Sequence, residues 1–82
     1  MIKGNDLRQL IELAFDYASA ETEQQVNQVH DQAAMLATET TTLSVWLDLV
    51  DYIKEWNSNN EHKYPMSRAS ALQFFLTRQA AL

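Results

Sequence analysis

The chain has 82 residues, a formal net charge of −5 and a hydrophobic fraction of 46%. This length suits one domain with a modest core, so residues 1–82 are predicted to be a single domain. Only one glycine and one proline occur, which argues against all-β folds because these need many tight turns. The absence of cysteine excludes zinc fingers and thiol catalysis and favours a reducing, cytoplasmic location. No apolar run is long enough to span a membrane.

Two amphipathic helices are predicted in the N-terminal half of the chain. Residues 6–20 place their apolar side chains on one helical face, made of Leu7, Leu10, Ile11, Ala14, Phe15, Tyr17 and Ala18. In the second helix, residues 23–38, Thr22 and Gln25 fit a capping box. Its apolar stripe is narrow and made of Val26, Val29, Ala33, Leu36 and Ala37. Because no glycine or proline separates the two segments, a single bent helix is an alternative.

The third predicted helix, residues 43–57, follows an interruption at Thr38–Thr42, where β-branched residues disfavour a helix. Apolar side chains cover well over half of its circumference: Leu43, Val45, Trp46, Leu47, Leu49, Val50, Tyr52, Ile53 and Trp56. A surface helix needs an apolar stripe only about 100° wide. This helix is therefore predicted to be the central one, or to face a second chain.

A polar loop over residues 57–65 leads to the fourth predicted helix, residues 66–80, with Pro65 suited to its first turn. Its expected core face consists of Ala69, Leu72, Phe75, Leu76 and Ala80, with Phe74 on the opposite side. The predicted fold class is all-α, a small bundle of about four helices (6–20, 23–38, 43–57 and 66–80).

Two groups of apolar residues exceed what a single chain of this size needs to bury. One is the flank of the third helix formed by Val45, Leu49, Tyr52 and Trp56. The other is the pair Phe74 and Met35, whose side chains point away from their predicted core faces. Exposed aromatic residues and methionines are enriched in protein interfaces. The interface candidates are Val45, Leu49, Tyr52, Trp56, Phe74 and Met35.

No arrangement of residues typical of catalysis or metal binding is found. Asp48, Asp51 and Glu55 share one helical face, but metal sites in helical bundles take ligands from several helices. This strip is interpreted as a solvated surface, and His30 as a histidine at the edge of its apolar stripe. We expect no enzymatic activity, no metal and no cofactor.

An alternative interpretation concerns residues 41–82. The partial alternation of residues 42–47 suits a strand, and helices over 49–58 and from the run Ser67-Arg68-Ala69-Ser70 onward would follow. This order resembles the ribbon-helix-helix regulators, whose paired strands enter the DNA major groove. The resemblance implies nucleic-acid contacts by Arg68, Arg78 and Lys63. The outward strand positions Thr42, Ser44 and Trp46 lack side chains that read bases, and the acidic chain disfavours phosphate binding.

The leading functional prediction is a small acidic helical module for protein–protein interaction. Such a chain would serve as an adaptor, accessory subunit or inhibitor of the kind that phages and mobile elements carry. We expect it to act as a homodimer and to bind another protein whose identity the residues do not specify, with nucleic acid and membranes disfavoured as partners.

Overall fold

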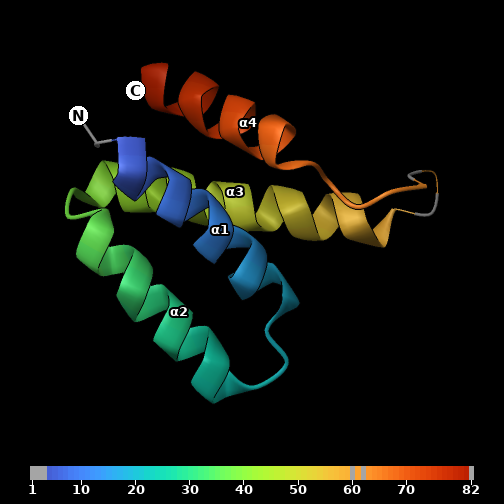
Figure 1. Cartoon of the computed structure of the whole chain (residues 1–82), viewed down its shortest axis with the longest axis horizontal. Helices are drawn as coiled ribbons and strands as arrows, with labels where there is room; N and C mark the ends of the chain where they lie inside the picture. The colour runs from blue at the N-terminus through green and yellow to red at the C-terminus, as the bar shows by residue number, and fades with distance from the viewer. Residues whose placement is uncertain (1–3, 60, 62, 82) are drawn as a thin grey trace.

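The computed structural model describes residues 4–59, 61 and 63–81 of the chain. These residues form four α-helices and no strand: α1 (Gly4–Ser19), α2 (Glu23–Leu36), α3 (Thr40–Ser58) and α4 (Arg68–Ala80) (Figure 1). The prediction of an all-α bundle of four helices is confirmed. The alternative strand over residues 42–47 is wrong, because these residues lie inside α3. Their helical spacing places Thr42, Val45 and Trp46 together in the core.

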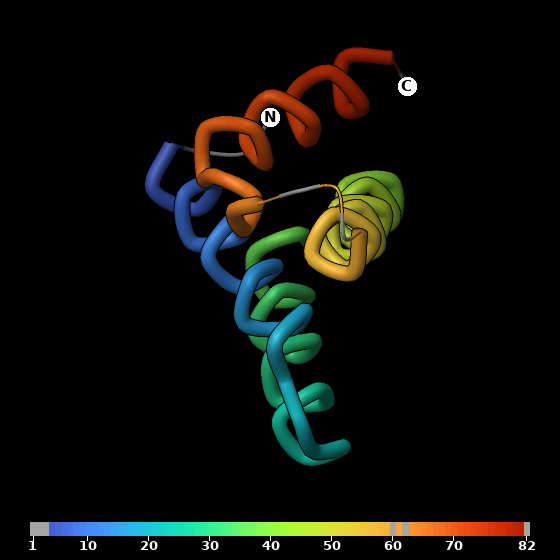
Figure 2. The backbone as a smooth tube through the Cα atoms, turned by 90° about the vertical axis from the view of Figure 1, so that its right-hand side faces the viewer, coloured from blue at the N-terminus to red at the C-terminus, as the bar shows by residue number. Residues whose placement is uncertain are grey.

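The helices form two antiparallel pairs. α1 and α2 make one helical hairpin and α3 and α4 make the other, with α3 crossing behind α1 in Figure 1. α1 packs against each of the other three helices, and α3 packs against both α1 and α4. Figure 2 shows α2 and α4 at opposite ends of the molecule, on either side of α1. α2 therefore depends mainly on α1 for its packing.

Trp46 of α3 lies at the centre of the core and contacts both α1 and α2. Its indole Nε1 donates a hydrogen bond of 2.9 Å to the carbonyl oxygen of Leu10 in α1. The ring of Tyr17 meets the indole edge to face at a centroid distance of 5.4 Å, and the imidazole of His30 does so at 6.4 Å. The prediction that His30 lies at the edge of the α2 stripe agrees with this position beside the core. Six side chains of α3 are buried, so the predicted central role of this helix is confirmed.

The first two helices are separate, so the alternative of one bent helix is wrong. The chain leaves the helical conformation after Ser19, and α2 begins at Glu23. The predicted capping box is present: Thr22 Oγ1 accepts from the backbone N–H of Gln25 at 3.2 Å, and Gln25 Oε1 accepts from the N–H of Thr22 at 3.3 Å. Satisfying these terminal N–H groups fixes the start of α2.

Four helix boundaries differ from the prediction by two or three residues. α1 begins at Gly4 instead of residue 6, and α2 ends at Leu36 instead of residue 38. α3 begins at Thr40 instead of residue 43, and Thr42 is buried, with its hydroxyl oxygen accepting a 3.1 Å hydrogen bond from Gln79 Nε2 of α4. This tertiary contact outweighs the low helix propensity of threonine. α4 begins at Arg68 instead of residue 66, because Ser67 caps it by accepting from the N–H of Ser70. Met66 precedes the helix and is buried in the core.

The expected core face of α4 is confirmed for Phe75 but is wrong for Ala69, Leu72, Leu76 and Ala80, because the helix is rotated about its axis. Ala71 and Phe75 are its buried residues, and Phe74 is partly buried, whereas Leu72 and Leu76 are 36% and 45% exposed. Phe74 stacks on Tyr52 of α3. This rotation buries aromatic rings in place of leucines, which removes more apolar area from water. Within the described residues, no helix is long and apolar enough to cross a membrane.

Candidate protein-interaction surface

An apolar depression lies between α1 and α2. We call it the α1–α2 groove; it has a volume of about 620 Å³ and is lined by Arg8, Gln9, Glu12 and Leu13 from α1 and by Gln32, Met35 and Leu36 from α2. No residue of α3 or α4 contributes to it, so it opens on the side of the hairpin that these helices leave uncovered. Its volume falls in the range of sites that bind ligands or side chains.

Met35 is the most exposed large apolar side chain of the described residues. It is 79% exposed and lies in the last turn of α2, beside the partly buried Leu36. The position agrees with the prediction that Met35 points away from the core. Methionine is flexible and polarisable, so it adapts to the shape of a partner surface.

Val45 and Leu49, two of the six interface candidates, are not surface residues. They are 3% and 0% exposed and belong to the core of the single chain. The apolar surplus of α3 is covered by α1 on one flank and by α4 on the other. The sequence-based prediction fails for these two residues because it assumed that only one neighbouring helix covers the apolar side chains of α3.

Tyr52, Trp56 and Phe74 form an aromatic cluster between α3 and α4. The rings of Tyr52 and Phe74 are stacked at 4.4 Å, and the ring of Trp56 meets Tyr52 edge to face at 6.5 Å. Trp56 Nε1 also donates to the carbonyl oxygen of Tyr64 at 3.0 Å. Phe74 therefore does not point away from the fold as expected, and the cluster joins α4 and its preceding loop to α3.

Arg68 forms the closest ion pair of the described residues. Its Nε and Nη2 atoms donate to the two carboxylate oxygens of Glu12 at 3.0 and 3.1 Å, and its guanidinium lies 3.9 Å from the ring centroid of Phe15. The hydrogen bonds from Arg68 lower the pKa of Glu12 below its usual value and raise that of Arg68. Two elements far apart in sequence, α1 and α4, are joined by this pair.

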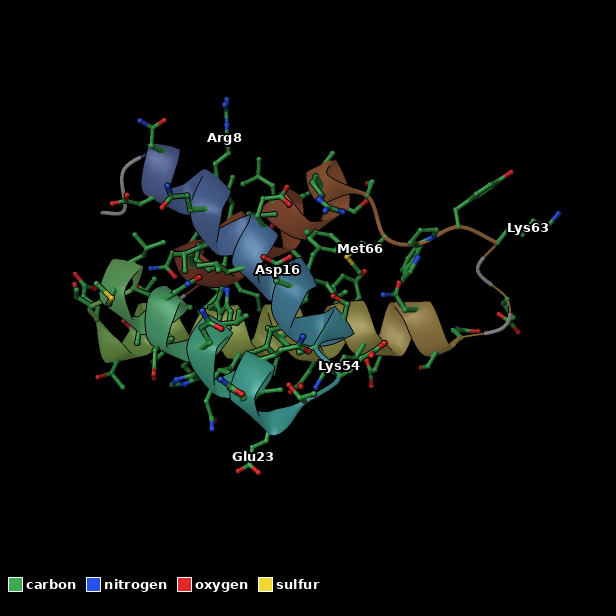
Figure 3. All side chains as sticks on the ribbon, turned by 60° about the horizontal axis from the view of Figure 1, so that its bottom comes forward. Arg8, Asp16, Glu23, Lys54, Lys63 and Met66 are labelled. Atoms are coloured by element: carbon green, nitrogen blue, oxygen red, sulfur yellow. The ribbon has the colours of Figure 1, made fainter. Side chains whose placement is uncertain are left out.

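The three candidate nucleic-acid residues do not form one basic patch. Arg68 is neutralised by Glu12, and Arg78 lies over the ring of Phe74 at 5.0 Å. They stand ten positions apart in α4, which is about 15 Å along a helix. Lys63 projects from the far end of the α3–α4 loop (Figure 3). Since residues 42–47 are helical, the strand that the ribbon-helix-helix resemblance requires is also missing.

The carboxylate strip of α3 is exposed along its whole length, as predicted for a solvated surface. Asp48, Asp51 and Glu55 belong to no group of three or more potential metal ligands among the residues that the structure describes. His30 faces Trp46, and its nearest carboxylate, that of Asp31, is 4.0 Å away.

Sequence reasoning missed most of the α1–α2 groove. Of its lining residues only Met35 was a candidate, and Leu13 was assigned to no face of the first helix. A signal was present, because Leu13 lies outside the face made by Leu10, Ile11 and Ala14 and so extends the apolar surface towards α2. The pairing of α1 with α2, which brings Leu13 near Met35 and Leu36, is a tertiary contact.

The fold defines the class of this protein as a small all-α protein of four helices arranged as two crossed hairpins. Comparison with known proteins gives no match to a family model, a curated protein or a solved structure.

Proposed function

We propose that the protein is a protein–protein interaction module and that the α1–α2 groove is its binding surface. The observation that carries this proposal is the exposure of α2. Ala33 is its only fully buried residue, and its last turn presents Met35, 79% exposed, at an apolar groove that the other described residues leave open. Grooves between two helices bind amphipathic helices through apolar side chains spaced three and four residues apart.

The chemistry of the groove supports a protein partner. Leu13, Met35 and Leu36 supply an apolar floor, and the polar lining consists of the amides of Gln9 and Gln32 and the charged groups of Arg8 and Glu12. A floor of this kind with a polar rim is the usual arrangement of a protein interface. Its exposed methionine also suits a surface that adapts to its partner.

Affinity capture of the tagged protein from lysate of its own cells, with nuclease added, tests the proposal. Wild type is compared with Met35→Lys, which places a charge on the groove, and with Leu76→Lys as the matched control. Met35 and Leu76 are both exposed and near the C-terminal ends of their helices, where lysine suits the helix dipole. We expect a stoichiometric protein partner with wild type and Leu76→Lys and its loss with Met35→Lys. Capture that Met35→Lys leaves unchanged would place the binding surface elsewhere.

A further inference from the structure

We infer that the occupant of the α1–α2 groove is a second copy of this chain, whose own α1–α2 hairpin packs face to face on the first. This inference rests on the proposed function and names the partner. Each copy would present the same groove, so the contact would be symmetric about a two-fold axis. The four helices of two hairpins would then enclose the apolar floors of both grooves, as in other bundles built from helical hairpins.

The exposed area of the chain matches the needs of such a dimer. The chain exposes 5857 Å² of accessible surface, whereas a compact monomeric protein of its mass of 9.4 kDa exposes about 5,000 Å². The excess of about 850 Å² is close to the area that each partner buries in an interface of standard size.

The charges of the groove are complementary to themselves. Arg8 and Glu12 are the charged residues of its lining, and they stand one helical turn apart on α1. Two antiparallel α1 helices with the two-fold axis between these positions place each Arg8 opposite Glu12 of the other copy. Arg8 makes no ion pair within the described residues and points away from the molecule (Figure 3).

Glu12 can serve both partners. Arg68 of its own chain occupies one site on each of its oxygens, and a carboxylate offers about four acceptor sites. A basic peptide could also meet Glu12, but it would bring no acidic group to Arg8. The complementary group for Arg8 is an acid, and the second copy supplies it.

Salt dependence separates these occupants further. Residues 4–36 contain six acidic residues and one basic residue, so two hairpins repel each other at long range. Added salt screens this repulsion within a Debye length of about 10 Å at 0.1 M, while the apolar contact is not weakened. The dimer is therefore expected to form at least as well at physiological salt as at low salt, whereas a basic peptide would bind less tightly.

Sedimentation equilibrium of the purified full chain over a range of concentrations tests the inference. We expect wild type to be a dimer and Met35→Lys to raise the dissociation constant of the dimer at least about tenfold, the effect of losing a central contact of an interface. Leu76→Lys, outside the groove, should dimerise as wild type does. Circular dichroism confirms that each variant is folded.

A charge exchange tests the antiparallel contact. Arg8→Glu and Glu12→Arg should each weaken the dimer, because each places like charges opposite one another, and an equimolar mixture of the two should recover a heterodimer. If Arg8→Glu and Glu12→Arg each dimerise as tightly as wild type, the antiparallel contact between the two α1 helices is wrong. If the wild-type chain stays monomeric at every concentration, the occupant of the groove is not a second copy of the chain. If capture of a different protein by that monomer still depended on Met35, the proposed function would stand with another partner.

Discussion

Trp46 Nε1 in α3 donates a 2.9 Å hydrogen bond to the carbonyl oxygen of Leu10 in α1, thirty-six residues earlier in the chain. Both residues are 0% exposed, so this bond lies in the interior, where an unpaired polar group is costly. It fixes the rotation of α3 relative to α1. The contacts of Trp46 with Tyr17 and His30 then join α1 and α2 to the same ring.

Trp46→Ala is expected to destabilise the fold by about 3–5 kcal/mol, the usual cost of removing a fully buried tryptophan. Trp56→Ala should cost less, because Trp56 is only partly buried. Urea unfolding followed by circular dichroism measures both variants. Equal losses for the two would show that Trp46 has no special place in the core.

Phe74→Ala is expected to cost about 1–3 kcal/mol, less than a fully buried phenylalanine, because it loses its stacking on Tyr52 and its contact with Arg78. Leu72→Ala should cost less than Phe74→Ala, since Leu72 is 36% exposed. The sequence pattern predicts the opposite order, with Leu72 in the core and Phe74 outside it. Chemical denaturation of the two variants decides between the two rotations of α4.

Thr42→Val is expected to lower the free energy of unfolding by about 1–2 kcal/mol, because it leaves Gln79 Nε2 without its acceptor in a part-buried place. Gln79 Oε1 is buried and has no hydrogen-bond partner among the described residues. Adding Gln79→Leu to Thr42→Val should therefore recover most of the loss, since replacing both polar partners by apolar groups is nearly neutral. Thermal unfolding of the single and double variants measures this, and additive losses would contradict the contact.

Glu12→Gln is expected to lower stability at neutral pH by no more than about 1 kcal/mol, because the Arg68 pair is exposed. Arg68 lowers the pKa of Glu12 in the folded state below 4.5. The contribution of the pair is therefore present above the unfolded-state pKa and is lost as the pH falls through the lower folded-state pKa. Urea midpoints at several pH values should show the gap between wild type and Glu12→Gln closing in acid. With Glu55→Gln as control, a gap that persists in acid would contradict the pair.

Local signals predicted the elements of this fold well. The amphipathic period of the first helix and the capping pair Thr22 and Gln25 depend on residues close in sequence, and both appear in the structure. The starts of α3 and α4 differ from the prediction by three and two residues, because Thr42 and Met66 are buried in the core. For the candidate site, only the exposed Met35 was found among the residues that line the groove.

The sequence by itself determined that this protein is helical, since the apolar period, the capping residues and the scarcity of glycine and proline act locally. Tertiary structure alone decided which faces are buried. Phe74 stacks on α3, whereas Phe75, Val45 and Leu49 are buried in the core. The α1–α2 groove remains open. The reason is physical: a helix with apolar residues on several sides has several rotations of similar local energy, and only packing against its neighbours selects one.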